Sequence, residues 1–383
     1  MKILFNFKHP SRGHKIDFRP IAAMWLIGFV LSFAAICLIS YLFHDSIEPS
    51  DWNEQLKKLI PRENITLRHR SEGWGDSRFG KYGICGIDDL AKYRCPKILI
   101  WGDSYVQALQ MDDKYKMAQV FTRNWKSEDG GRHELLAASI AFGGTNIADY
   151  YFMMPYYQKT AGNPICNFIF LHSFADVSAD VPGISNAVFS SKPEFNLKFN
   201  YIEPVMWKQD LIQQMSNLGM DFLWFLYKDI NSYELNFRLE TFEQKKGHKK
   251  VEKGSKFFEI KKPNAKMVES WDFLMKKLKE VSTVPIVFVY CPDLPQVTKD
   301  ETILDDSQKD SVPEFRKICK KNNIDLIDMT PDFTDFYKST HIFPRGFQNS
   351  WPYGGHINRY GHVLTSKAIQ NYMEEHIDAL YPD

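Results

Sequence analysis

The stretch KILIWGDSYVQAL, residues 97–109, decides the fold. Residues 97–101 are an apolar run of the kind that a buried parallel strand requires. Gly102 and Asp103 readily form turns and end the run, and an apolar pattern resumes at Val106. Ser104 is therefore expected at the carboxyl end of a strand and before a helix, where α/β folds bind ligands. A serine at this position can also serve only as the cap of the helix.

Further apolar runs predict a sheet around this strand. We expect strands at 97–101, 134–140, 165–171, 284–290 and 324–327. Helical patterns lie between and after them, at 115–125, 147–157, 267–281, 313–322 and 360–379. Strands that alternate with helices imply a mostly parallel sheet with right-handed crossovers. The expected fold class is therefore α/β, a three-layer α/β/α sandwich on a five-stranded sheet.

Residues 177–265 interrupt the alternation and are too long for a plain crossover, so we expect an insertion near the catalytic face. Within it, 206–230 has a helical pattern. An aromatic cluster at 222–227 is expected in the core, or else at a substrate wall or a membrane-facing surface. The basic run at 244–256 is typical of a solvated loop, and it could also attract an anionic polymer or a lipid headgroup.

The amino-terminal region predicts a membrane anchor. Residues 21–43 carry no charged side chain and are long enough to cross a bilayer as a helix. Basic residues precede this run and acidic residues follow it, so the positive-inside rule places the amino terminus in the cytoplasm. No small-residue cleavage site closes the run. We expect a cytoplasmic tail at 1–20, one transmembrane helix at 21–43, and the remainder outside, in the periplasm or the extracellular space.

Residues 44–96 are polar and rich in Gly, Arg and Asp, and we expect a stalk followed by an irregular lead-in. The domain proper would then span 97–383, including the insertion. Outside the cell disulfides are permitted, and Cys85 and Cys95 lie close enough in sequence to pair. Cys166 and Cys291 lie in apolar runs and are expected to be buried thiols. The formal net charge of +1 gives no sign of a nucleic-acid partner.

A nucleophilic serine needs a base within hydrogen-bond distance, and the candidate is His356. It lies in YGGHINRYGH, residues 353–362, where glycines before the histidine would let a loop carry the imidazole over the sheet edge. The alternative is that His356 is only a polar loop residue. A metal site is not expected, because His356 and His362 have no neighbouring carboxylate. We expect no cofactor.

Stabilising an oxyanion requires N–H donors beside the nucleophile. The backbone N–H of Ser104 is one candidate. Gly143 or Gly144, which follow the second predicted strand, would supply another, because a glycine lets the backbone approach a substrate closely. The alternative is an ordinary glycine turn.

The triplet Gly102-Asp103-Ser104 after a strand, together with the closing His-x-Asn-x-x-Gly-His of residues 356–362, resembles the SGNH/GDSL hydrolase family. The resemblance covers about 97–180 and 284–380. It implies the open α/β sandwich, Ser104 as nucleophile, His356 as base, His362 as a structural residue and a donor from the glycines at 143–144. Tyr290-Cys291-Pro292 and residues 327–331 are similar to segments of the polysaccharide-modifying branch.

The chain departs from this family pattern at two positions. Ala175 stands where the family has an asparagine oxyanion donor, and His172, Ser173 or Asn146 would have to replace it. Tyr353 and Gly354 stand where the family has an aspartate that orients the histidine. A backbone carbonyl would then orient His356 in a Ser-His dyad, or one of two carboxylates would reach it from a strand end. These two carboxylates are Asp293 and Asp328.

The sequence thus predicts a membrane-anchored serine esterase or O-acyltransferase acting on O-acyl groups, acetyl in particular, of an envelope glycan. Its partners would be an acylated carbohydrate, the membrane through one helix and, for a transferase, a membrane-bound acyl donor. A second hypothesis is a catalytically degenerate subunit that binds glycan or serves assembly, because both departures would weaken catalysis.

Overall fold

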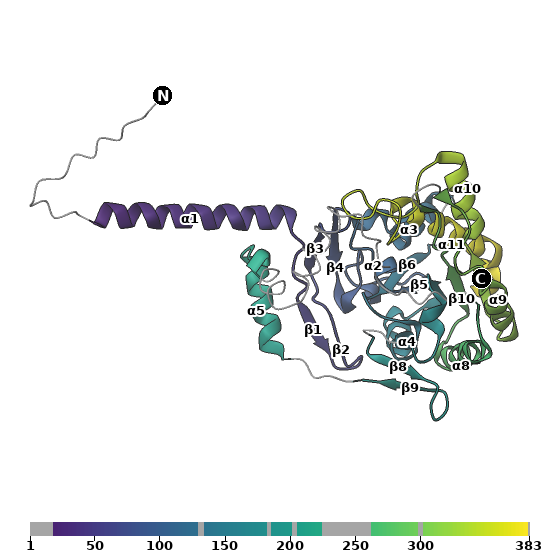
Figure 1. Cartoon of the computed structure of the whole chain (residues 1–383). Helices are drawn as coiled ribbons and strands as arrows, with labels where there is room; N and C mark the ends of the chain where they lie inside the picture. The colour runs from purple at the N-terminus through teal and green to yellow at the C-terminus, as the bar shows by residue number, and fades with distance from the viewer. Residues whose placement is uncertain are drawn as a thin grey trace, which may run out of the picture.

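A five-stranded parallel sheet forms the centre of the computed structural model, which describes residues 18–128, 134–181, 185–200, 205–223, 262–297 and 302–381. The strands are β5 (Lys97–Gly102), β6 (Leu136–Ala141), β7 (Pro164–Leu171), β10 (Ile286–Tyr290) and β13 (Asp325–Asp328). They lie in the order β13-β10-β7-β5-β6, and every neighbouring pair is parallel (Figure 1). The strand β5, which comes first of the five in the chain, therefore lies between β6 and β7, as in doubly wound folds. The predicted fold class and all five strands are confirmed.

Helices cover both faces of this sheet. One face carries α4 (Ile147–Ala161), α8 (Ala265–Val281) and α9 (Val312–Lys321), whose apolar residues join one buried cluster. The other carries α3 (Met117–Glu128), α10 (Thr330–Thr340) and α11 (Arg359–Leu380), which join a second cluster. Alternate residues of β5 enter opposite clusters, because successive side chains of a strand point to opposite faces. The predicted three-layer arrangement follows from this alternation.

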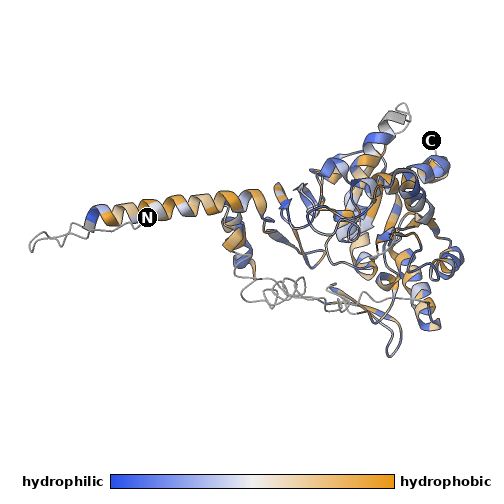
Figure 2. Cartoon of the chain, turned by 45° about the horizontal axis from the view of Figure 1, so that its top comes forward, coloured by the Kyte–Doolittle hydropathy of each residue, from blue (hydrophilic) through white to orange (hydrophobic). Residues whose placement is uncertain are grey.

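The amino-terminal helix α1 (Phe18–Phe43) extends away from the sheet (Figure 2). The most apolar 18 residues within 19–43 have a mean hydropathy of 2.5, and none of them is buried. The helix is therefore long and apolar enough to cross a membrane. The basic residues of the predicted tail before position 18 lie outside the described residues.

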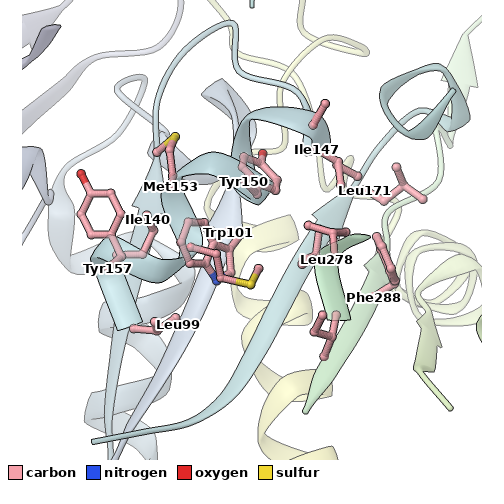
Figure 3. Packing of buried hydrophobic residues seen from close by; sticks show 14 of the residues in the cluster. Leu99, Trp101, Ile140, Ile147, Tyr150, Met153, Tyr157, Leu171, Leu278 and Phe288 are labelled. Carbon is pink, nitrogen blue, oxygen red and sulfur yellow. The ribbon is translucent and has the colours of Figure 1, made fainter. Parts of the chain in front are cut away.

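Trp101 at the end of β5 is the centre of the larger cluster (Figure 3). Its ring packs against Tyr150 and Tyr157 of α4, with centroids 5.7 and 6.0 Å away. Its indole Nε1–H donates to Oδ1 of the buried Asn167 on β7 at 2.9 Å. Paired polar groups of this kind fix the register of neighbouring strands without leaving an unsatisfied group in the core. The strand β5, which ends two residues before Ser104, is therefore held firmly.

Residues 44–96, expected as a stalk and an irregular lead-in, contain two antiparallel strand pairs. These are β1 (Ser50–Asn53) with β2 (Lys58–Pro61), and β3 (Ile65–His69) with β4 (Gly75–Phe79), followed by the short 3-10 helices η1 (Lys81–Gly83) and η2 (Leu90–Lys92). Leu67, Phe79 and Cys85 form a small buried cluster of their own. The loop between β3 and β4 reaches the candidate site.

The suggested pairing of Cys85 with Cys95 is wrong, because the two form no disulfide. The Cys85 thiol instead donates to Oδ1 of Asp113 at 3.0 Å and lies 2.8 Å from Nζ of Lys116. Burial raises the pKa of Cys85 to about 12, so the sulfur stays protonated. The other two thiols considered, Cys166 and Cys291, are buried as expected.

The predicted insertion begins with a hairpin of β8 (Ala187–Ser190) and β9 (Asn196–Phe199), followed by α5 (Met206–Asn217). The helix expected at 206–230 ends earlier, before Gly219, which has a φ of +67°. Residues 224–261 lie outside the described residues, and with them the basic run and most of the aromatic cluster. The remaining short elements are α2 (Ser104–Gln107), η3 (Asp113–Tyr115), η4 (Phe174–Val177), β11 (Gln296–Val297) and β12 (Thr302–Ile303).

Candidate active site

Ser104 is the first residue of α2, directly beyond the carboxyl end of β5. Asp103 caps this turn, since its carboxylate accepts the N–H of Tyr105 at 2.9 Å. Backbone N–H groups in a first helical turn have no acceptor within the helix. Because β5 lies between β6 and β7, Ser104 lies at the switch point of the sheet, where doubly wound folds bind ligands.

Gly102 makes the sharp turn before Ser104 possible. A Cβ atom there would lie 2.2 Å from a side-chain carbon of the buried Val106. We expect Gly102→Ala to destabilise the fold by roughly 1–3 kcal/mol and to displace Ser104, which would lower the rate of any reaction at Ser104 about a hundredfold. Urea unfolding and ester turnover would measure the two effects. Val106→Ala should partly restore both in the double variant; no restoration would contradict this reading.

His356 lies in the loop between α10 and α11 and reaches Ser104. Its Nε2 is 2.8 Å from the Ser104 hydroxyl oxygen, across 252 positions of the chain. Gly355 precedes it with a φ of +79°, a conformation that favours glycine. Gly354 is packed against the Trp351 ring so closely that a Cβ would lie 2.7 Å from it. The glycines before the histidine thus allow the approach that the sequence suggested.

Glu72 completes this arrangement, and the sequence analysis did not identify it. Its Oε2 lies 2.7 Å from Nδ1 of His356, and its Oε1 accepts the His356 backbone N–H at 3.4 Å. Gln110 donates to the same carboxylate at 3.3 Å. Burial opposes ionisation, but the hydrogen bonds from His356 and Gln110 hold the pKa of Glu72 below its ordinary value. The ionised carboxylate therefore fixes the Nδ1–H tautomer and leaves Nε2 free to accept the serine proton.

The orienting groups proposed from the sequence do not take this role. Asp293 forms an ion pair with the buried Arg345, and Asp328 lies 3.1 Å from the Arg316 guanidinium. Nor does a backbone carbonyl contact the imidazole nitrogens, since both have side-chain partners. The carboxylate comes instead from the β3–β4 loop, which precedes the serine in the chain.

The loop that carries Glu72 is held on two sides. Gly73 adopts a φ of +74°, and its N–H donates to Oδ1 of Asn349 at 2.8 Å. The side-chain amide of Asn349 donates back to the carbonyl oxygens of Arg70 and Gly73, both at 2.8 Å. On the other side, Asp45 accepts the backbone N–H groups of Arg70 and Ser71. The loop therefore presents Glu72 in a fixed position.

The two glycines considered as oxyanion donors, Gly143 and Gly144, follow the end of β6. The Gly143 N–H lies near the Ser104 turn but donates to Oε1 of Gln107 at 3.1 Å. Gly144 has a φ of +76° and makes the turn after β6. A substrate oxygen could use the Gly143 N–H only by displacing the Gln107 side chain.

The three side chains considered as replacements for the missing asparagine have other partners. Asn146 caps α4 by accepting the Asp149 N–H at 3.2 Å, and Ser173 accepts the Ala175 N–H at 3.2 Å. His172 bonds to Asp103.

A second histidine lies beside the first. The Tyr105 ring is stacked on His172, with centroids 4.1 Å apart, and its centroid lies 4.7 Å from that of His356. Nε2 of His172 is 2.9 Å from Asp103 and 3.4 Å from Asp176. Burial alone would lower the pKa of His172, but these two carboxylates raise it to about 9. His172 is thus a cation at neutral pH and ties the serine turn to the end of β7.

The pairing of His172 with Asp103 and Asp176 predicts that the stability of the fold depends on pH. The pKa of His172 is about 9 in the folded chain against an ordinary 6.5, so the folded state holds its proton more tightly. The resulting stabilisation is complete below pH 6.5 and is lost as the pH rises through 9, at no more than about 1.4 kcal/mol per pH unit. We expect His172→Gln to flatten the fall in melting temperature between pH 7 and 9. Equal slopes for both proteins would contradict the pairing.

His362 lies in the first turn of α11 and is fully buried. Its Nδ1 accepts the Met117 N–H at 3.1 Å, which joins α11 to α3. Burial, with smaller contributions from Lys116 and His356, lowers the pKa of His362 to about 3, so the ring is neutral. These contacts agree with the structural role that the resemblance implied.

No family model and no curated protein matches the sequence. Among solved structures, the chain is similar to the acetyl xylan esterase AlAXEase, with 13% identity over 72% of this chain and 98% of that one and a TM-score of 0.37. It is also similar to a catalytic mutant of Axe2, an acetylxylan esterase from Geobacillus stearothermophilus, with 10% identity over 72% of this chain and 92% of that one and a TM-score of 0.36. The likeness to TesA has 9% identity over 73% of this chain and 98% of that one, with a TM-score of 0.35. These likenesses are low, and the activities named are those of the other proteins.

Proposed function

We propose that this chain is an SGNH-like serine enzyme that transfers acyl groups from esters. The observation that carries the proposal is the continuous line of contacts from Ser104 through His356 to Glu72, at 2.8 and 2.7 Å. A hydroxyl, an imidazole and a carboxylate in this order are the parts of a catalytic triad, which recurs on unrelated folds. A residue that only capped α2 would need neither the imidazole nor the carboxylate.

In the proposed mechanism, Ser104 attacks the acyl carbonyl while His356 takes its proton at Nε2. Glu72 stabilises the resulting imidazolium. The developing oxyanion accepts hydrogen bonds from the Ser104 N–H and the Gly143 N–H. At Gly143, the substrate oxygen replaces Oε1 of Gln107 as the acceptor. His356 then returns the proton to the leaving alcohol, leaving an acyl-enzyme. In the second half, His356 activates water in an esterase or a sugar hydroxyl in an O-acyltransferase.

We further propose that the chain is anchored in a membrane by α1, with its amino terminus in the cytoplasm and the α/β domain outside. The apolar character of α1 and the charges on either side of it support this topology. An enzyme held there would meet O-acetylated envelope glycans, and a transferase would receive its acyl group from a membrane-bound donor. Measuring acetyl transfer to water against transfer to an added sugar would separate the two reactions.

The alternative function, a degenerate glycan-binding subunit, is favoured by two observations. Ala175 provides no side-chain donor, and the Gly143 N–H already has a partner in Gln107. The complete Ser104–His356–Glu72 line argues against it, because a binding subunit has no use for an oriented base. The enzyme is therefore the better proposal.

A fluorophosphonate probe tests this proposal directly, because it reacts only with an activated serine. The full chain in detergent should be labelled at Ser104, and Ser104→Ala should not be labelled. Labelling of neither protein would support the degenerate subunit, and labelling of both at the same rate would exclude Ser104 as the activated serine.

A further inference from the structure

Helix α5 has an exposed apolar stripe. Trp207, Leu211 and Leu218 are 64%, 47% and 67% exposed. Leu218 directly follows the last residue of α5, and the spacing of four and seven residues places all three on one side of the helix axis, which they share with the exposed Gln214. The opposite side is packed on the domain, where Ile212 is buried and the Arg62 guanidinium bonds to Gln213 at 3.4 Å. The stripe is therefore the side of α5 that the domain leaves uncovered.

The chain directly after α5 packs against the last turns of α1. The Phe222 N–H donates to Oγ of the buried Ser40 at 2.9 Å, and a Cβ at Gly219 would lie 3.5 Å from the Cys37 carbonyl oxygen. Asp221 accepts the Ile47 N–H at 2.9 Å and pairs with Arg68 at 3.0 Å. Figures 1 and 2 both show α5 running crosswise to α1 beside its carboxyl-terminal end.

The length of α1 sets the depth of these contacts in a bilayer. Its 26 residues span about 39 Å at 1.5 Å per residue. The hydrocarbon core of a bilayer is about 30 Å thick, so the end of α1 emerges among the headgroups. Cys37 and Ser40 lie in the last two turns. The segment after α5 therefore meets α1 where the acyl chains give way to headgroups.

We propose that α5 is an interfacial helix, lying in the headgroup region of the bilayer that α1 crosses, with Trp207, Leu211 and Leu218 facing the acyl chains. A helix across the spanning direction at this depth, with one apolar side and a tryptophan, has the features of such helices. The occupant of the stripe is thus lipid. This inference rests on the membrane anchoring in the proposed function.

The carboxyl-terminal end of α1 also contacts the β3–β4 loop, which carries Glu72 of the candidate site. Phe43 at the end of α1 packs edge-on against Trp74, with centroids 5.9 Å apart, and Trp74 is 58% exposed. Trp74 follows Glu72 in the loop that Asp45 holds. With α1 and α5 both attached to the bilayer, the domain cannot rotate freely. Ser104 therefore keeps a fixed orientation relative to the membrane surface.

Tryptophan quenching tests the depth of α5. The full chain would be placed in nanodiscs of phosphatidylcholine with or without bromine on the upper acyl carbons, which quench only nearby indoles. The difference between wild type and Trp207→Phe isolates the emission of Trp207, and the difference for Trp25→Phe isolates a residue within α1. We expect both emissions to lose most of their intensity in brominated discs. Leu211→Asp should reduce the quenching of Trp207 and leave that of Trp25 unchanged.

The two tryptophans separate the possible failures. Quenching of Trp25 without quenching of Trp207 would overturn the interfacial helix and leave the anchor intact. Quenching of neither would overturn both the anchor and the helix, while the chemistry at Ser104 would still be judged by the fluorophosphonate probe. Quenching of Trp207 that persists unchanged in Leu211→Asp would contradict the assignment of the stripe as the lipid-facing side.

Discussion

Replacing Ser104 with alanine is expected to lower kcat for a chromogenic acetyl ester by about 10⁴-fold or more. The reason is that the proposed covalent intermediate cannot form without the hydroxyl that lies 2.8 Å from His356. The fold should remain, because Asp103 and not Ser104 caps α2. Turnover by the full chain in detergent measures the first expectation, and thermal unfolding measures the second.

Ser173→Ala is the matched control for this change. Ser173 follows the neighbouring strand β7, and its hydroxyl oxygen accepts only the Ala175 N–H among the contacts described for it. We expect this variant to stay within a few-fold of wild type. Turnover that is equal in wild type and Ser104→Ala would exclude Ser104 as the nucleophile.

Glu72→Gln is expected to lower kcat by about 10²- to 10⁴-fold with little change in KM. The glutamine has nearly the same shape, but it removes the charge that stabilises the imidazolium. Its amide group also offers a donor to Nδ1 of His356, which favours the tautomer that cannot accept the serine proton at Nε2. The rate should therefore fall although the geometry is kept. Steady-state kinetics over a range of ester concentrations would separate kcat from KM.

Two variants control for the Glu72 substitution. Glu63→Gln makes the same chemical change at an exposed position of the same segment, and it should leave kcat within a few-fold of wild type. Asp328→Asn tests the carboxylate that the sequence suggested, and it should also have little effect on the rate. A large loss in Asp328→Asn together with normal turnover in Glu72→Gln would refute the assigned triad.

The sheet could be predicted from the sequence because its signals are local. Strands β5, β6, β7 and β10 are short, nearly continuous apolar runs that helices bury on both faces, whereas the edge strand β13 is only partly buried. The Gly102-Asp103-Ser104 turn and the glycines before His356 are local signals of the same kind. They indicated which two loops come together, since the carboxyl ends of parallel strands meet at one edge of a sheet.

Glu72 could not be predicted, because nothing near it in the sequence indicates its partner. Its position depends on how the β3–β4 hairpin packs against the domain, and its contact with His356 spans 284 positions. The polar composition of residues 44–96 suggested a stalk, although strand pairs with few apolar residues form there. Cys85 gave a similarly misleading signal, since its nearness to Cys95 in sequence said nothing about Lys116 and Asp113.

The most direct measurement is to look for the acyl-enzyme itself. The full chain would be mixed with excess aryl acetate, quenched in acid within the first turnovers, digested and examined by mass spectrometry. The proposed mechanism predicts an acetyl group on the peptide that contains Ser104, at higher occupancy when a slowly hydrolysed ester is used. An acetyl group found only elsewhere, or turnover that proceeds with Ser104 unmodified at every time point, would contradict it.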